Sequence, residues 1–253
     1  LKRVTGLDER KKDHALARGV HWTLGMQSRN GGWGAFDTDN TLDLWNQMPF
    51  GDMKAMIDPP TADLAGRLLE MMGTFGYDKE FGRAQRALTF LRNEQERDGS
   101  WWGRWGVNYI YGTWSVLVGL RAIGEDMNLP YVRRAVAWLK ARQNADGGWG
   151  EDGSSYKLDY RGYEPAPSTS SQTAWALLGL MATGDVNDPA VARGIAYLAR
   201  TQGSDGFWQE DRYTATGFPR VFYLRYHGYR KYFPLWALAR YRSLTARNDR
   251  TVR

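Results

Sequence analysis

The sequence contains no cysteine and only three histidines in 253 residues. The absence of cysteine excludes disulfide frameworks, thiolate metal sites and cysteine nucleophiles. The three histidines, His14, His21 and His227, are too widely separated to predict a metal site, and we expect neither a metal nor another cofactor. The longest apolar run, residues 174–182, is shorter than the roughly 20 residues of a spanning helix. The chain is therefore not expected to cross a bilayer.

Charge is unevenly distributed, although the net charge is only +6. Residues 220–253 hold nine Lys or Arg and one acidic residue, Asp249, so the first 219 residues carry −2. A basic end on a near-neutral body suggests an anionic surface as partner, either anionic lipid or nucleic acid. The mild overall charge argues against nucleic acid.

Four segments repeat one pattern of arginine, glutamine and tryptophan. In every copy the Gln follows the Arg by nine residues and the Trp follows the Gln by six. The copies are Arg18–Gln27–Trp33, Arg86–Gln95–Trp101, Arg134–Gln143–Trp149 and Arg193–Gln202–Trp208. Identical double spacings indicate a repeat protein. We expect these Gln and Trp side chains to be structural.

Each copy predicts a helix that ends in a glycine-rich turn, with a more apolar helix between copies. The apolar helices are expected at residues 61–72, 111–123, 169–183 and 222–233, with C-caps at Gly73, Gly124 and Gly184. Two alternating helix types predict an all-α chain, an α/α barrel that is incomplete here because only eight or nine helices are countable. Insertions at residues 37–60 and 151–168 are expected as loops at one end of it.

The aromatic content is high, with 12 Trp, 14 Tyr and 9 Phe. Steps of four, four and three residues predict that Phe218, Phe222, Tyr226 and Tyr229 share one helix face. Such a stripe fits a buried core, which periodicity alone favours. It also fits a dry cavity that stabilises a carbocation, because aromatic faces attract positive charge without quenching it.

Asp63 and Arg67 are four residues apart on a predicted helix, so they can form an ion pair. A solvated surface pair is the plainer interpretation. Phe36 and Trp105 lie in glycine-rich turns, where a large aromatic side chain serves either as a packing anchor or as part of a pocket.

The Gln–Trp repeat resembles the QW motif of the class II triterpene cyclases, and the whole chain is similar to the C-terminal portion of a squalene–hopene cyclase. Five further segments carry the likeness, at residues 30–40, 58–63, 103–112, 171–175 and 216–224. The resemblance implies an α6–α6 barrel. It also implies an isomerase (an intramolecular transferase) that converts squalene to hopene and hopanol by protonation-initiated polycyclisation.

The resemblance implies roles for individual residues. Asp63, Arg67 and Tyr111 would support the proton donor. Phe50 and Met53 would line a nonpolar entrance channel. The residues implied at the cavity that holds the substrate and its cations are Phe36, Trp105, Phe218, Phe222, Tyr226 and Tyr229.

The family's proton-donor motif, Asp-x-Asp-Asp-Thr-Ala, does not occur in the sequence. By the resemblance it would lie just before Leu1, and the family's second, inserted barrel domain is missing as well. Residues 1–253 are therefore expected to be the C-terminal part of the catalytic barrel domain and to be inactive alone.

The implied partners are squalene, a membrane lipid surface and a second copy in a homodimer. The apolar stretch 45–57 and the basic end would contact lipid. This predicts a peripheral, monotopic protein on the cytoplasmic face of a bacterial inner membrane.

Three other functions fit parts of the pattern. A glycoside hydrolase with an α/α barrel uses a pair of carboxylates, and none stands out here. A protein prenyltransferase β-subunit needs a zinc site with cysteine, which this chain cannot supply. A noncatalytic lipid-binding or interaction domain is favoured by the missing donor motif.

Overall fold

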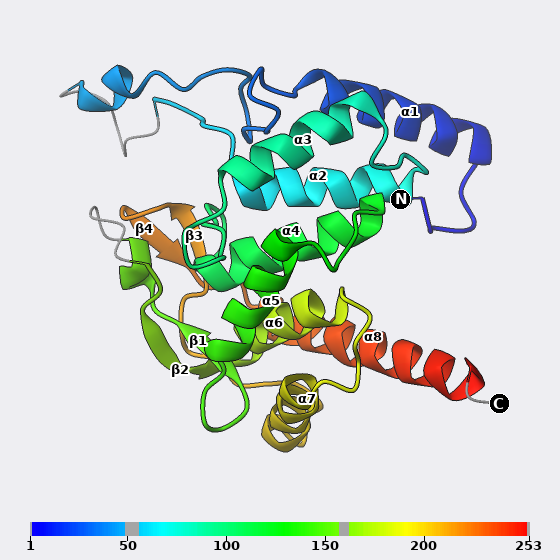
Figure 1. Cartoon of the computed structure of the whole chain (residues 1–253), viewed down its shortest axis with the longest axis vertical. Coiled ribbons are helices and arrows are strands. Elements are labelled where there is room, and N and C mark those ends of the chain that lie inside the picture. Colours follow the sequence, from blue (N-terminus) through cyan, green and yellow to red (C-terminus); the bar gives the residue numbers. More distant parts are fainter. Residues whose placement is uncertain (1, 49–55, 157–161, 252–253) are drawn as a thin grey trace.

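The computed structural model describes residues 2–48, 56–156 and 162–251 (Figure 1). The α-helices in these ranges are α1 (Glu9–Gly25), α2 (Ala62–Thr74), α3 (Gly82–Asn93), α4 (Tyr109–Ile123), α5 (Pro130–Ala141), α6 (Ser170–Met181), α7 (Pro189–Thr201) and α8 (Tyr229–Thr251). The 3₁₀-helices are η1 (Asp43–Gln47) and η3 (Gly153–Tyr156). The strands are β1 (Trp149–Glu151), β2 (Pro165–Thr169), β3 (Ala215–Phe218) and β4 (Phe222–Leu224). The predicted all-α class is confirmed as a mostly helical fold.

The helices alternate between two environments. Every residue of α6 is buried, and α4 is nearly as enclosed. Helices α3, α5 and α7 each bury one face, and α1 buries no residue. Helix α2 packs on α4, α4 on α6 and α6 on α8, so these four form a continuous inner layer (Figure 1). The two predicted helix types therefore correspond to an inner and an outer layer.

Helices α2 and α4 cross with their backbones in contact, which requires glycine on both sides. A Cβ on Gly66 would lie 2.5 Å from the carbonyl oxygen of Ser115, and one on Gly119 would lie 2.2 Å from that of Gly66. No side chain fits these gaps. The crossing brings together the N-terminal halves of both helices, which carry three of the predicted site residues, Asp63, Arg67 and Tyr111.

The predicted C-caps are correct in part. Gly124 ends α4 in the left-handed conformation, with φ of 83°, as a C-terminal glycine does. Gly184 has φ of 89° and lies two residues beyond the C-cap of α6, Ala182. Gly73 is not a cap. It lies inside α2, where a Cβ would come 2.2 Å from the carbonyl oxygen of Ala122, so its role is close packing.

The first three repeat Gln residues each join their own turn to the outer helix of the next repeat. Gln143 Nε2 donates to the carbonyl oxygens of Gly147 at 2.8 Å and Ala190 at 2.9 Å, and its Oε1 accepts from Arg193. The same three bonds recur at Gln27, with Gly31, Arg83 and Arg86, and at Gln95, with Gly99, Tyr131 and Arg134. The repeat Arg of one unit is thus bound by the Gln of the unit before it.

Each repeat Trp is buried, and its indole N–H donates to the carbonyl oxygen of the residue ten positions earlier. The four acceptors are Thr23, Leu91, Leu139 and Leu198. A helix end leaves carbonyl groups without intrahelical partners. The Trp satisfies one of them and fills the space beneath the turn, as a structural residue does.

The helix predicted over residues 222–233 is wrong. Residues 222–224 form β4, which pairs with β3 in an antiparallel hairpin that turns through Pro219 and Arg220, the latter with φ of 72°. Helix α8 begins only at Tyr229, after Gly228. The four-residue spacing of Phe218 and Phe222 spans a turn and not a helix. Pro219 has no N–H to donate, and the positive φ of Arg220 cannot continue a helix.

The irregular segments gather on one side of the molecule (Figure 1). Helix η1, the β1–β2 pair and the β3–β4 hairpin all lie there, away from the marked chain ends. The described parts of the two insertions lie on this side, although the second holds η3 and β2 and is not a plain loop. None of the helices in the described ranges has both the length and the apolarity to cross a membrane.

Candidate functional site

Asp63, in the first turn of α2, is 1% exposed. Its Oδ2 accepts the backbone N–H groups of Arg104 at 3.1 Å and Trp105 at 3.0 Å. Its Oδ1 is buried and has no hydrogen-bond partner among the described residues. Burial raises the pKa of the Asp63 carboxyl, against the opposing effects of the neighbouring Thr61 hydroxyl and of the backbone N–H groups. One oxygen therefore holds a loop in place while the other is left for a further polar group.

Arg67 does not form the predicted ion pair with Asp63. Its Nη1 lies 2.5 Å from Glu70 Oε2, and its Cζ lies 3.7 Å from the centroid of the Trp114 ring. A guanidinium stacks well on an indole face, so Trp114 and Glu70 together decide its direction. The i,i+4 spacing predicted only that Asp63 was within reach.

Tyr111, in the first turn of α4, lies near both charged groups. Burial raises the pKa of its hydroxyl above the ordinary value of 10, and the Asp63 carboxylate raises it further, whereas Arg67 lowers it. The hydroxyl is therefore protonated across the physiological range. Asp63, Arg67 and Tyr111 therefore lie close enough to influence one another, although no hydrogen bond joins them directly.

A group of rings that we call the tryptophan cluster packs around Tyr111, between α4, α6 and α8. It consists of Tyr111, Trp114, Trp175, Tyr229 and Phe233. The two indoles are stacked at 5.9 Å with an interplanar angle of 9°, and Tyr111 meets Trp175 edge-on at 4.9 Å.

Trp114, Trp175 and Phe233 were not singled out from the sequence. The i,i+3 spacing of Tyr111 and Trp114 and the i,i+4 spacing of Tyr229 and Phe233 were available signals. The pairing of Trp114 with Trp175 was not predictable, because it joins helices that are far apart in the chain.

Two further ring pairs, Phe36 with Trp105 and Phe218 with Phe222, are together called the aromatic wall, because the Trp105 loop joins the β3–β4 hairpin through a backbone bridge between Gly106 and Ala215. Phe36 and Trp105 meet edge-to-face with ring centroids 6.0 Å apart, and so do Phe218 and Phe222. Phe36 is 67% exposed and Phe222 38%. Large rings this accessible are not core residues, so the core interpretation fails for these two.

The four aromatic residues predicted on one helix face are divided between two elements. Phe218 and Phe222 lie on the β3–β4 hairpin, whereas Tyr226 precedes α8 and Tyr229 begins it. Tyr226 packs on Tyr229 with centroids 5.0 Å apart and is 49% exposed. The structure thus assigns one pair to the aromatic wall and Tyr229 to the tryptophan cluster.

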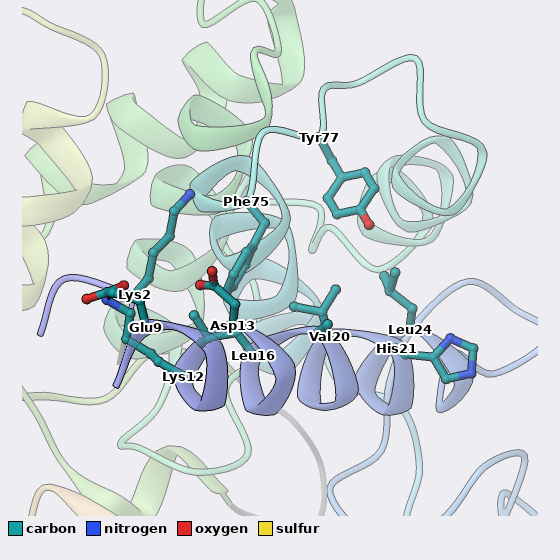
Figure 2. Close-up of a pocket in the computed structure, with 11 residues that line it drawn as sticks. Lys2, Glu9, Lys12, Asp13, Leu16, Val20, His21, Leu24, Phe75 and Tyr77 are labelled. Carbon is teal, nitrogen blue, oxygen red and sulfur yellow. The ribbon is translucent and has the colours of Figure 1, made fainter. Parts of the chain in front are cut away.

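Phe50 and Met53, predicted at the entrance channel, lie outside the described residues. A cavity of about 620 Å³ lies elsewhere, between α1 and the loop after α2. In Figure 2 side chains of α1 point toward Phe75 and Tyr77 across it. It contains none of the predicted site residues.

Two further buried carboxylates cap the inner helices from outside. Glu151 accepts the backbone N–H groups of Asn108, Tyr109 and Ile110 at 3.0–3.1 Å, at the start of α4. Glu210 does the same for α6, accepting from the Ser171 backbone and from serine hydroxyls. A carboxylate at a helix N-terminus satisfies free donors and complements the helix dipole. The Glu151 cap holds the turn of α4 that carries Tyr111.

Comparison with known proteins gives a consistent result. The family described as squalene–hopene cyclase C-terminal domain matches residues 1–243. A probable squalene–hopene cyclase of Sinorhizobium fredii is 59% identical over 92% of the chain, and the squalene–hopene cyclase of Zymomonas mobilis is 54% identical over 100% of it. The match covers 36% and 39% of these relatives and falls in their C-terminal portion.

Solved structures show the same fold at low sequence identity. A type II terpene cyclase from Scytonema, in complex with geranylgeranyl dihydroxybenzoate, superimposes with a TM-score of 0.56 at 19% identity, covering 80% of this chain and 53% of that one. An ent-copalyl diphosphate synthase from Streptomyces platensis gives 0.51 at 20% identity, covering 88% of this chain and 36% of that one.

Proposed function

Because the chain belongs to the squalene–hopene cyclase C-terminal domain family, we propose that it forms the cation-stabilising part of a squalene–hopene cyclase. The observation that carries the proposal is the pairing of a buried carboxylate, Asp63, with two groups of aromatic rings beside it. The curated relatives it matches are cyclases, which favours this function over a glycoside hydrolase or a noncatalytic domain.

In the proposed reaction a proton adds to one end of squalene and the double bonds then close rings in turn. The last cation loses a proton to give hopene or takes up water to give hopanol. Each ring of the aromatic wall attracts the moving positive charge by about 0.5–2 kcal/mol without forming a bond to it. Excluding water strengthens this attraction and prevents early quenching.

The start of the reaction needs an acid whose conjugate base is stabilised. Arg67, held over Trp114, would favour the negative charge left on the donor after proton transfer. Asp63 Oδ1 is the buried acceptor without a partner among the described residues, and it would orient the donor. Tyr111 stays protonated and can donate a hydrogen bond toward the same place.

The inner and outer helix layers support an α/α barrel of which this chain forms only a part. We propose that residues 1–253 are the C-terminal part of the catalytic barrel domain and act together with the remaining portion that the longer relatives possess. Squalene partitions into lipid, which supports a peripheral, monotopic position at the cytoplasmic face of a bacterial membrane. Exposed Trp45 and Met56, 43% and 41% accessible, would contact that surface. A homodimer is part of the same proposal.

A chimera tests the activity. The chain replaces the matching C-terminal 39% of the Z. mobilis enzyme, and squalene turnover is followed by gas chromatography of hopene and hopanol. We expect turnover by the chimera and none by the chain alone. Arg67→Ala should abolish initiation, whereas Arg29→Ala, whose side chain is 93% exposed, should not. Full turnover by the Arg67→Ala chimera would remove Arg67 from the proposed role.

A further inference from the structure

Residues 103–106 form the loop that carries Trp105, and the glycine at each end of it is in close contact with neighbouring residues. A Cβ on Gly103 would lie 2.6 Å from the carbonyl oxygen of Asn108, and one on Gly106 would lie 2.4 Å from the Tyr111 ring. The loop backbone therefore lies directly against the start of α4. The direction of the Trp105 ring depends on how firmly these two glycines are held.

Tyr156, the last residue of η3, holds both of them. Its side chain is 1% exposed, and the single proton of its hydroxyl is shared between the carbonyl oxygen of Gly106, at 2.6 Å, and that of Gly103. These carbonyl groups flank Trp105 on its two sides. Burial raises the pKa of the Tyr156 hydroxyl well above 10, so the group remains a donor at any working pH.

The same tyrosine also contacts the β3–β4 hairpin. Its carbonyl oxygen accepts Arg220 Nε at 2.6 Å, and its ring packs on Tyr223 with centroids 6.2 Å apart. The hairpin bonds independently to the loop, through Val107 N to the Thr214 carbonyl oxygen at 3.0 Å. Tyr156 thus lies where the Trp105 loop and the hairpin of Phe218 and Phe222 meet.

We propose that Tyr156 is a positioning residue that sets the placement of Trp105 relative to Phe218 and Phe222; the consequence for cyclisation rests on the proposed function. A polyene that closes several rings in one site needs stabilising groups at fixed points along its path. If Trp105 moves, the cation near it is less stabilised, and deprotonation at that stage competes with the next ring closure. Tyr156 therefore governs how far cyclisation proceeds rather than whether it starts.

Amide hydrogen exchange on the 253-residue chain tests the positioning without any activity. Tyr156→Phe keeps the ring and removes the hydroxyl, and peptides covering residues 102–108 should exchange roughly fivefold to tenfold faster, as expected for the loss of one net hydrogen bond. Peptides of α6 should not change. Tyr197→Phe is the matched control, because the Tyr197 hydroxyl, on α7, donates to the carbonyl oxygen of Ser168, on β2, at 3.1 Å. Unchanged exchange at residues 102–108 would overturn the proposal.

The product profile of the Z. mobilis chimera tests the consequence. Tyr156→Phe should increase the share of products with fewer rings about fivefold, on the same loss of one hydrogen bond, while total squalene consumption stays within about twofold. Tyr197→Phe should leave both unchanged. An active chimera whose Tyr156→Phe products match the parent's would refute the effect on cyclisation. An inactive parent chimera would instead contradict the proposed function, and the exchange result would still decide the positioning role.

Discussion

The repeat turns and the aromatic wall differ in the sequence distance over which their contacts are made. Within each repeat turn the Trp binds a carbonyl oxygen ten residues earlier and the Gln binds that of a glycine four residues later. Of the side-chain hydrogen bonds of these residues in the described ranges, only those from Gln27, Gln95 and Gln143 to the next outer helix span more, 36–59 residues. The wall is held by bonds between residues that are far apart, such as Thr216 to Arg104, 112 positions away, and Trp105 to Asp63, 42 positions away. Local contacts leave a periodic pattern in the sequence, and distant contacts leave none.

The two regions also differ in burial. All four repeat Trp residues are at most 3% exposed, whereas Phe36 and Phe222 of the aromatic wall are exposed well beyond that. The repeat turns therefore contribute mainly to the stability of the chain. Phe36 and Phe222 bury less of their rings and are expected to contribute less to it.

The largest effect is expected in the repeat turns. Trp149→Ala removes a fully buried indole and its bond to Leu139, and should lower the free energy of unfolding by about 4 kcal/mol. Urea denaturation measures the loss. Trp22→Ala, at 62% exposure, is the control and should change stability by about 0.5 kcal/mol or less. Similar losses for the two variants would contradict the assignment.

The second largest effect is a change in unfolding free energy with pH, and it is expected at Glu151, two residues after the repeat Trp149. Burial raises its pKa to about 7 in the folded chain, above the ordinary 4.5 of the unfolded one. Between pH 4.5 and pH 7 the folded chain binds more protons at Glu151 than the unfolded chain does. The free energy of unfolding that Glu151 contributes is therefore highest below pH 4.5 and falls by about 3 kcal/mol as the pH rises through 7.

Glu151→Gln removes this titration. The difference in unfolding free energy between the parent and the variant should therefore change between pH 5 and pH 8, with the parent losing more stability. Urea denaturation at both pH values measures it, and other titrating groups cancel in the difference. Parallel pH profiles would show that Glu151 does not titrate in this range.

A smaller difference in stability is expected between the third and the fourth copies of the repeat. Gln143 bonds its own turn and two residues of α7, whereas Gln202 donates to Gly206 at 2.8 Å and bonds no repeat Arg within the described residues. Gln143→Ala should therefore cost about 2 kcal/mol of unfolding free energy and Gln202→Ala about 0.5 kcal/mol. Equal costs would mean that the bonds between repeats add nothing to stability.

The smallest stability effect belongs to the aromatic wall. Phe222→Ala should lower the unfolding free energy by about 1 kcal/mol or less, since the ring is 38% exposed. In the Z. mobilis chimera it should nevertheless raise the share of incompletely cyclised products. A stability loss as large as that of Trp149→Ala, with an unchanged product profile, would make Phe222 a core residue.

The sequence predicted the structure well where a helix could be located from the composition of its own residues. Apolar composition located α2, α4 and α6 within a few residues, and glycine marked the end of α4. It misled where a spacing had two explanations. The steps from Phe218 to Tyr229 match a helix, but Pro219 and Gly228 interrupt it and the segment pairs as a hairpin. Arg67 had Asp63 and Glu70 within reach, and stacking on Trp114 selected Glu70.

By itself the sequence determined the repeat, the alternation of two helix types, the absence of thiol chemistry and the family likeness, because each depends on residues close together in the chain. Only the tertiary structure decided which rings meet, that Asp63 holds the Trp105 loop, and that Tyr156 joins this loop to the hairpin. Such contacts depend on how helices cross and on which backbone groups are left unpaired, and these are properties of the folded chain as a whole.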